Sequence, residues 1–334
     1  MKFLREIVGH KQIVKTLLNA VDHGRVAHAY LFIGPEGVGK ETTAAAFARA
    51  LLCSRPVSGE ACGECRECRQ VEHRNHPDFY FIQPSGASIK IEQIRIIQRW
   101  APYRSYQGGR KVFLIQQAET MTAEAANCLL KTLEEPPGDT VFILLSSRPQ
   151  ILLPTILSRC QQLVFKGIPA GELAGSLAGT YGLPAEVAVV TAALSGGSMG
   201  KAHAYTSGSF DQERNAAIKL AGDLNKGGLM EALGMAEKIA EKKDKVFSVL
   251  EMLTCWYRDL LVCRETGEDS FLYNLDQAET VKKEARSFET GRLVEIIENI
   301  EATKRKIEYN ANVRLVLEAL FLNLSGSSDS CYEA

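Results

Sequence analysis

Apolar residues follow two different periods along this chain. In the first 166 residues, short continuous apolar runs alternate with stretches in which apolar residues recur every three or four positions. Continuous runs are typical of parallel strands covered on both faces, whereas the longer period is typical of amphipathic helices. The predicted strands are 29–33, 79–82, 111–115, 140–145 and 162–165. This alternation predicts an α/β domain with a parallel five-stranded sheet.

Beyond residue 166 the pattern becomes helical. Residues 168–205 carry short helical stretches with a glycine turn at 195–198, and longer helical patterns follow from about residue 209. The longer predicted helices are 216–224, 230–240, 246–262, 293–307 and 312–324. We therefore expect three domains, an α/β domain at 1–166, a small helical domain at 167–207 and an all-helical domain at 208–330.

Composition narrows the class of protein without identifying it. The chain has 334 residues, 46% of them hydrophobic, and a formal net charge of −1. A charge near zero argues against binding nucleic acid through bulk charge, although it leaves room for a local basic surface. No apolar run approaches the ~18 residues of a membrane span, and the N-terminal residues lack the pattern of a targeting segment. We expect a cytoplasmic protein with no membrane contact.

A glycine-rich loop joins the first predicted strand to a helix expected at 42–52. Backbone N–H groups of such a loop converge on phosphate, and its lysine reaches the outer phosphates. The pattern then calls for Ser or Thr, whose hydroxyl holds Mg²⁺, but this chain has Glu41. Thr42 offers a hydroxyl one residue late, turned by about 100° around the helix. The nucleotide-binding positions, expected to bind ATP weakly or not at all, are Gly34, Gly37, Gly39, Lys40 and Thr42.

The end of the third predicted strand departs from the same pattern. A P-loop ATPase places there an Asp that positions Mg²⁺ and a Glu that polarises the attacking water. This chain has Gln116 and Gln117 instead, and an amide holds neither the cation nor the proton as a carboxylate does. Two independent losses predict a site that does not hydrolyse ATP.

Four of the nine cysteines lie in one short polar segment, 53–68. Cysteines separated by two residues can converge on one tetrahedral ion, because a tight turn brings both sulfurs to one side. Four thiolates close the coordination shell, so we expect a structural zinc rather than a catalytic one. The alternatives are free buried thiols, or a site in which His73 or His76 replaces a cysteine. The expected ligands are Cys53, Cys62, Cys65 and Cys68.

Three further segments carry recognisable motifs, namely 126–137 (ANCLLKTLEEPP), 153–160 (LPTILSRC) and 310–318 (NANVRLVLE). Together with the loop and the cysteines, they resemble the AAA+ clamp-loader family of bacterial DNA polymerase III, and within it the delta-prime type of subunit. The resemblance covers the entire chain. It implies a RecA-like AAA+ P-loop domain, a helical lid domain, and a C-terminal helical collar through which five subunits join.

The Ser-Arg-Cys segment is the most specific part of this resemblance. In the family, its arginine projects into the ATP site of the next subunit as an arginine finger. Carried over, this role falls on Arg159, with Ser158 beside it. The resemblance therefore implies a residue that acts in trans, in the active site of a neighbouring chain.

Departures from the family pattern indicate the type of subunit. The motor subunits carry Thr after the loop lysine, Asp-Glu after the third strand, and a lid arginine that senses the γ-phosphate. At the corresponding places this chain has Glu41, Gln116, Gln117 and the pair Gly200-Lys201. The pattern implies a component of the DNA polymerase III holoenzyme that completes a neighbour's site without hydrolysing ATP itself.

The resemblance also implies partners. These are gamma/tau-type motor subunits and a delta subunit in a five-subunit ring, and, through the assembled complex, the sliding clamp and primer-template DNA during DNA replication. Two other classes are weighed against this reading. An autonomous AAA+ ATPase motor would need the missing Mg²⁺ ligands. A zinc-finger nucleic-acid binder would use arginines near the cysteines, but Glu60, Glu64, Glu67 and Glu72 nearly cancel the charge of Arg66, Arg69 and Arg74.

Overall fold

The computed structural model describes residues 3–107, 109–206, 210–242, 245–309 and 311–325. Asn310, which belongs to the last sequence motif, and the expected boundary at 207–208 lie outside the described residues. The chain forms two compact units. The first comprises Met1–Leu183 and Ser195–Ala202, and the second comprises Pro184–Leu194 and His203–Ala334.

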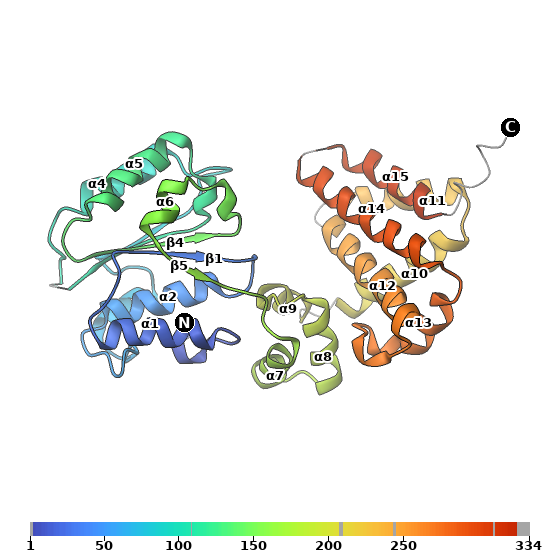
Figure 1. Cartoon of the computed structure of the whole chain (residues 1–334), viewed down its shortest axis with the longest axis horizontal. Coiled ribbons are helices and arrows are strands. Elements are labelled where there is room, and N and C mark those ends of the chain that lie inside the picture. The colour runs from blue at the N-terminus through green and yellow to red at the C-terminus, as the bar shows by residue number, and fades with distance from the viewer. Residues whose placement is uncertain (1–2, 108, 207–209, 243–244, 310, 326–334) are drawn as a thin grey trace. The chain divides into compact units, whose positions relative to one another are not determined.

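The first unit is built on a five-stranded sheet in the order β2-β3-β4-β1-β5 (Figure 1). All neighbouring strands are parallel, and β1 lies between β4 and β5 with Leu31 opposite Leu144 and Gln162. Every residue of β3 and β4 is buried, as their continuous apolar runs require. The strands are β1 (Ala29–Ile33), β2 (Phe79–Ile82), β3 (Lys111–Ile115), β4 (Thr140–Ser146) and β5 (Gln161–Val164). The predicted parallel α/β fold is confirmed.

Helices cover both faces of this sheet (Figure 1). One layer contains α1 (Lys11–Asp22), α2 (Lys40–Leu52) and α3 (Arg66–Glu72), and the other contains α4 (Ile91–Trp100), α5 (Ala123–Glu134) and α6 (Pro154–Arg159). Successive strand residues serve the two layers in turn, because side chains alternate across a strand. In β1, Tyr30 and Phe32 pack in the first core and Leu31 packs in the second.

The second unit is a helical domain with its own core. Trp256 and Tyr257 are fully buried in that core. The helices beyond the sheet are α7 (Ala170–Tyr181) in the first unit, α9 (Met199–Tyr205) at the boundary between the units, and α8 (Ala185–Leu194), α10 (Phe210–Lys226), α11 (Leu229–Ala240), α12 (Val246–Thr266), α13 (Ala278–Ala285), α14 (Thr290–Glu308) and α15 (Val313–Leu324) in the second. The hydrophobic pattern did not predict α13, which buries only Val281 and Ala285.

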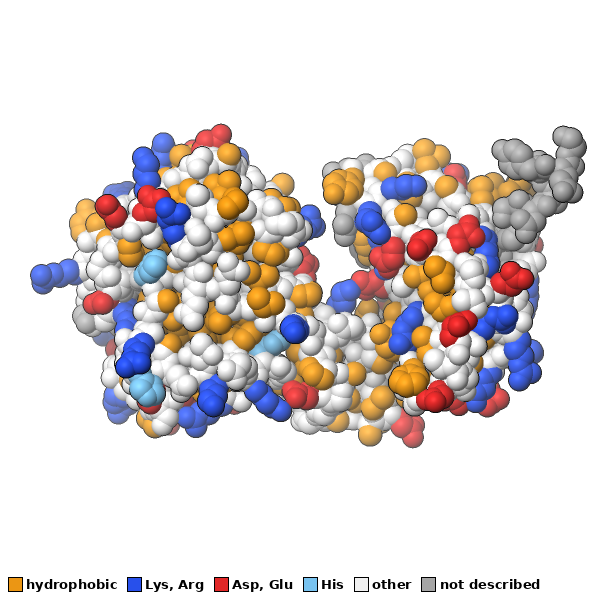
Figure 2. All heavy atoms as spheres, viewed as in Figure 1, with side chains coloured by type: hydrophobic (Ala, Val, Ile, Leu, Met, Phe, Trp, Pro, Cys, Tyr) orange, Lys and Arg blue, Asp and Glu red, His pale blue; other side chains and the backbone are white. Residues whose placement is uncertain are grey.

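Short 3₁₀ turns complete the elements. They are η1 (Leu4–Glu6), η2 (Ala118–Thr120), η3 (Pro149–Ile151), η5 (Asp269–Phe271) and η6 (Leu275–Gln277). On the face drawn in Figure 2, basic and acidic side chains are interspersed over both units, in keeping with the net charge of −1. Among the described helices, none is long and apolar enough to cross a membrane.

Trp256 provides a test of the helical core. Its indole is fully buried and its Nε1 donates to Glu284 Oε2 at 3.3 Å. We expect Trp256→Ala to lower the free energy of unfolding by about 3–5 kcal/mol, because the truncation removes apolar contacts and leaves a cavity. The control is Tyr309→Ala at a side chain that is 86% exposed, with an expected effect within about 0.5 kcal/mol. Equal effects of the two variants in urea titrations would contradict this description of the core.

Candidate functional site

The carboxyl ends of the parallel strands meet at one edge of the sheet, where the loops that follow them bring polar side chains together. Lys40 ends the loop after β1, Gln116 follows β3, and Ser147 follows β4. Lys40 Nζ donates to Ser147 Oγ at 3.2 Å, and Gln116 Nε2 donates to Glu41 Oε2 at 3.1 Å. The structure thus brings three residues into one site: the loop lysine Lys40, and Glu41 and Gln116, which stand where an ATPase has its Mg²⁺ ligands.

The Lys40 ammonium group is turned onto its own loop. It donates to the carbonyl oxygens of Gly34 and Pro35 as well as to Ser147 Oγ, so each of its three hydrogens has an acceptor. The residue is only 8% exposed. Burial lowers the pKa of Lys40, while the nearby carboxylates of Glu119 and Glu36 act in the opposite direction. A bound phosphate would have to replace these internal hydrogen bonds.

Helix α2 begins at Lys40, two residues earlier than expected. Gly39 is its N-cap, with φ of 103° in the left-handed region that glycine adopts without a steric penalty. The predicted Thr42 is exposed. The hydroxyl that bonds to the loop belongs instead to Thr43, which donates to the Gly39 carbonyl at 2.8 Å.

The segment that precedes and begins α9 packs directly on the loop. Ser198 Oγ donates to the Glu36 carbonyl at 3.1 Å, and Gly200 N donates to the Gly37 carbonyl at 3.0 Å. Gly37 has φ of 74°, and a Cβ there would lie 2.2 Å from Ser198 Oγ. Only glycine fits this backbone conformation together with this close approach.

Glu41 occupies the position from which a hydroxyl would hold Mg²⁺, and its carboxylate has two partners. Gln116 Nε2 donates to one oxygen at 3.1 Å, and Arg74 NH2 donates to the other at 3.1 Å. The two positions that would supply Mg²⁺ ligands in an ATPase are therefore bonded to each other.

Two residues that follow β3, Gln117 and Glu119, differ in their surroundings. Gln117 is exposed and adopts φ of 50° at the start of η2. Glu119 Oε1 accepts a hydrogen bond from Ser147 N at 2.9 Å, and its charge acts on Lys40. Sequence reasoning missed Glu119, because the motif ends before it and only the fold brings it against the loop after β4.

Arg159 lies at the C-terminal end of α6, on the side of the helix away from the core. Ile156 and Cys160 are buried against the α4–α6 layer, whereas Arg159 is half-buried. Its guanidinium donates to Glu134 Oε1 at 2.6 Å and to the Thr155 carbonyl at 3.0 Å. Glu134, from α5, is the partner that sequence reasoning did not identify.

The residues on either side of Arg159 differ in environment. Ser158 is exposed and its hydroxyl donates to the Thr155 carbonyl at 3.1 Å, within the same helix. Burial raises the pKa of the Cys160 thiol to about 12, so this side chain is a neutral core group. The motif thus anchors the helix end through Cys160 and leaves Arg159 at the surface.

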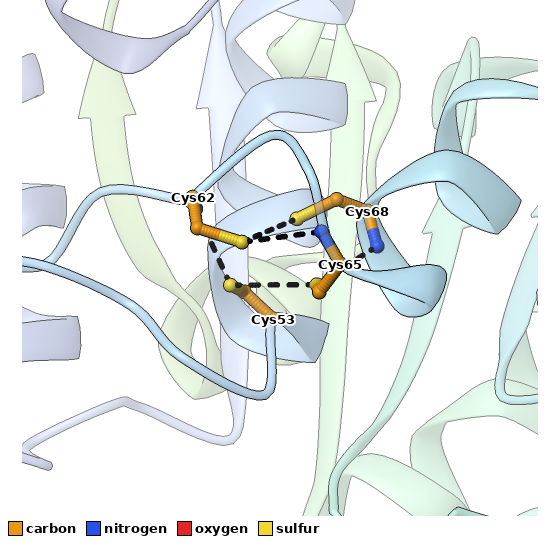
Figure 3. A group of neighbouring side chains, drawn as sticks. All are labelled: Cys53, Cys62, Cys65 and Cys68. Atoms are coloured by element: carbon orange, nitrogen blue, oxygen red, sulfur yellow. Dashed lines mark hydrogen bonds between the residues drawn. The ribbon is translucent and has the colours of Figure 1, made fainter.

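The four predicted cysteines lie together (Figure 3), with Cys53 at the C-cap of α2, Cys65 at the N-cap of α3 and Cys68 in the first turn of α3. Their sulfur atoms are all within 4.8 Å of one another, with 3.9 Å between Cys53 and Cys65 and 4.0 Å between Cys62 and Cys68. A tetrahedral ion with metal–sulfur bonds of about 2.3 Å has sulfur–sulfur edges of roughly 3.8 Å. Neither His73 nor His76 belongs to this group. The donor set and its spacing fit one metal ion.

Backbone N–H groups of residues 53–68 donate hydrogen bonds to the cysteine sulfurs and so stabilise their thiolate form. N–H groups of Cys62, Cys65 and Cys68 donate to the sulfurs of Cys53, Cys62 and Cys65 at 3.3–3.4 Å. Burial acts to raise the pKa of Cys62, but hydrogen bonds from the backbone of Glu64 and Cys65 outweigh it and lower that pKa to about 6. Burial raises the pKa of Cys53 and Cys68, and a bound cation would oppose this shift by stabilising their thiolates.

Comparisons with known proteins agree along the chain. A family model described as "DNA polymerase III, delta subunit" matches residues 9–169, and one described as "DNA polymerase III, delta subunit, C terminal" matches residues 209–326. DNA polymerase III subunit delta' of Bacillus subtilis is 33% identical over 94% of this chain and 95% of its own length. The delta' subunit of Pseudomonas aeruginosa is 44% identical over 52% of this chain and 53% of its own length. DNA polymerase III subunit tau of B. subtilis is 26% identical over 97% of this chain and 61% of its own length.

Replacement of one cysteine tests the metal site. We expect Cys68→Ser to lower metal affinity at least about tenfold, which costs about 1.4 kcal/mol of stability when metal is in excess. Metal content by elemental analysis and thermal unfolding with and without a chelator measure both effects. Cys128→Ser, at a partly buried thiol outside the group, should retain the metal.

Metal affinity should rise with pH across the neutral range. Binding needs four thiolates, and the raised pKa values of Cys53 and Cys68 mean that protons compete with the metal at lower pH. A metal-titration series between about pH 6 and pH 8 measures this slope. A pH-independent affinity would show that the thiols are not the ligands.

Proposed function

This chain belongs to the family of DNA polymerase III delta' subunits, and from that membership we propose that it acts in the clamp loader during DNA replication. In this role it does not hydrolyse ATP. It supplies Arg159 to the ATP site of a neighbouring motor subunit and thereby helps to load the sliding clamp onto primed DNA. Its similarity to delta' along nearly its whole length supports this assignment over that of an independent motor.

The observation that carries the absence of hydrolysis is the hydrogen bond between Glu41 and Gln116. In a P-loop ATPase, a hydroxyl and a carboxylate at these two positions hold Mg²⁺ between them. Here the carboxylate and the amide satisfy each other at 3.1 Å. Gln117, at the position of the residue that polarises water, is an amide and cannot accept a proton as a carboxylate would.

Arg159 suits a role in a partner's site. A guanidinium fixed beside a γ-phosphate neutralises the charge that spreads over the equatorial oxygens in the transition state, an effect worth roughly 10³- to 10⁵-fold in related systems. The short helix α6 and the ion pair with Glu134 hold the Arg159 side chain at the surface. Because contact with the phosphate requires ATP in the neighbour, the nucleotide state of that neighbour would set the spacing of the two subunits.

We infer that the ion held by Cys53, Cys62, Cys65 and Cys68 is zinc with a structural role. Tetrahedral thiolate sites select zinc or iron–sulfur chemistry, and the Cys-x₂-Cys-x₂-Cys spacing with a fourth cysteine from the end of α2 suits a single ion. Four protein ligands leave no open position for a substrate. The zinc would fix residues 53–68 on the α1–α3 face of the sheet.

The proposed assembly follows from the same family. We propose that residues 1–166 act as the P-loop domain, 167–207 as the lid and 208–330 as the collar that joins the subunits. The proposed partners are gamma/tau-type motor subunits and a delta subunit in a five-subunit ring. The sliding clamp and primer-template DNA are reached through the assembled complex.

The purified chain alone should show no ATP turnover with Mg²⁺ present. The physical reason is the lack of carboxylate and hydroxyl ligands for the ion at Glu41, Gln116 and Gln117. Steady-state phosphate release is the measurement, with Lys40→Ala as the control for contaminating activity. Turnover at a motor-like rate that Lys40→Ala abolishes would identify an autonomous ATPase and refute the proposal.

Arg159→Ala should leave assembly of the complex intact and slow ATP turnover at the neighbouring site by roughly 10³-fold or more. Turnover and clamp loading are measured in the reconstituted complex, and assembly is measured by size-exclusion chromatography. The matched control is Arg25→Ala, an exposed arginine of the same unit, which should leave turnover unchanged. Full turnover by the Arg159→Ala complex would rule out the finger role.

A further inference from the structure

Glu41 replaces a hydroxyl that would hold Mg²⁺, and its carboxylate also connects two other parts of the chain. An unpaired carboxylate beside a phosphate loop would repel a nucleotide and attract cations, since like charges disfavour each other at short range. This carboxylate is paired on both oxygens, by Gln116 from the end of β3 and by Arg74 from beyond α3. Three elements far apart in the sequence thus supply one compact polar cluster, which we call the Glu41 cluster (Glu41, Gln116 and Arg74).

The position of Arg74 is fixed from several sides. Its backbone has φ of 55°, and its N–H donates to the Val71 carbonyl at 3.0 Å as α3 ends. Its guanidinium carbon lies 4.4 Å from the centre of the Phe81 ring in β2, within the range of a cation–π contact. The same guanidinium reaches Glu41 Oε1 at 3.1 Å. Arg74 is therefore directed at the loop by the turn after α3 and by the edge of the sheet.

The cysteine segment 53–68 helps to position Arg74. Cys65 is the N-cap of α3, its sulfur accepts from Cys68 N, and both residues belong to the cysteine group. Val71, on the same helix, is buried in the core that also contains α2. The helix that places Arg74 is thus tied at its start to the cysteines and along its length to α2.

The charges of the Glu41 cluster balance without a bound cation. The carboxylate contributes −1, the guanidinium +1 and the amide none, so the cluster is neutral without a metal. Mg²⁺ prefers oxygen ligands in an octahedral arrangement, but both Glu41 oxygens already accept N–H donors. A fixed positive charge from Arg74 also opposes entry of a second cation at the same carboxylate.

We propose that Arg74 and Gln116, by occupying both oxygens of Glu41, exclude Mg²⁺ from this loop. Any affinity of the loop for ATP is then independent of Mg²⁺. This inference deepens the proposed absence of hydrolysis by assigning Arg74 to the site. It does not involve Arg159, so the two proposals can fail separately.

The test is a titration of the full chain with a fluorescent ATP analogue, in excess Mg²⁺ and in excess EDTA. In the unmodified chain, Mg²⁺ should give no gain in affinity. The double variant Glu41→Thr/Gln116→Asp restores a hydroxyl and a carboxylate, and Mg²⁺ should tighten its binding at least about tenfold. If the double variant does not fold, as judged by circular dichroism, Glu41→Thr alone should show a smaller gain of the same sign.

Arg74 is tested in the same titration. Arg74→Ala frees one oxygen of Glu41, so Mg²⁺ should tighten binding by up to roughly fivefold, the upper range for an exposed ion pair. Arg69→Ala, at an exposed arginine on α3 outside the cluster, is the matched control and should show no gain. A tenfold Mg²⁺ gain in the unmodified chain would overturn the proposal. So would a double variant without any gain, or an Arg74→Ala chain that behaves like Arg69→Ala. ATP turnover in the reconstituted complex, measured with Arg159→Ala, stays independent of each of these outcomes.

Discussion

Burial of the parallel sheet on both faces is the constraint on which the first unit depends. The neighbouring strands β3 and β4 are buried at every residue, and their polar residues lie at the strand ends, Lys111 and Thr140 at the starts and Ser146 at the end of β4. Parallel pairing brings all the carboxyl ends of the strands to one edge, where the polar loops that follow them gather. The glycine loop, Gln116 and Ser147 meet there for this reason, although they lie in separate parts of the chain.

At this edge Lys40 and Glu41 are paired with neighbouring polar groups, because an unpaired polar group that loses contact with water is costly. Lys40 bonds to carbonyls of its own loop, and Glu41 bonds to Gln116 and Arg74. Packing alone also requires glycine at Gly34 and Gly37, whether or not a nucleotide binds. A Cβ at Gly34 would lie 2.3 Å from the Phe165 carbonyl oxygen, which no side chain could accommodate without movement of the backbone. An intact glycine pattern is therefore compatible with a site that has lost its catalytic groups.

The cysteine segment 53–68 and the segment 153–160 that contains Arg159 pack on opposite faces of the same sheet. Cys65 and Cys68 are buried in the core formed with α1 and α2, whereas Cys160 is buried in the core formed with α4 and α5. Each buried sulfur fixes a short segment whose neighbouring charged residue remains at the surface. On the second face this residue is Arg159, held by Glu134. On the first face, α3, which Cys65 caps, leads to Arg74 and so connects the cysteines to the nucleotide loop.

The sequence by itself determined the five strands, the loop and the four cysteines that lie together, because hydrophobic period and motif spacing are local properties of the chain. It missed α13, whose few buried residues give a weak pattern, and it placed the start of α2 two residues late. Only the tertiary structure decided which polar groups meet. Glu41 lies 33 residues from Arg74 and 75 from Gln116, and Arg159 lies 25 from Glu134. No local pattern encodes such pairs, because they form only when strand order and helix packing bring distant segments to one edge or one face.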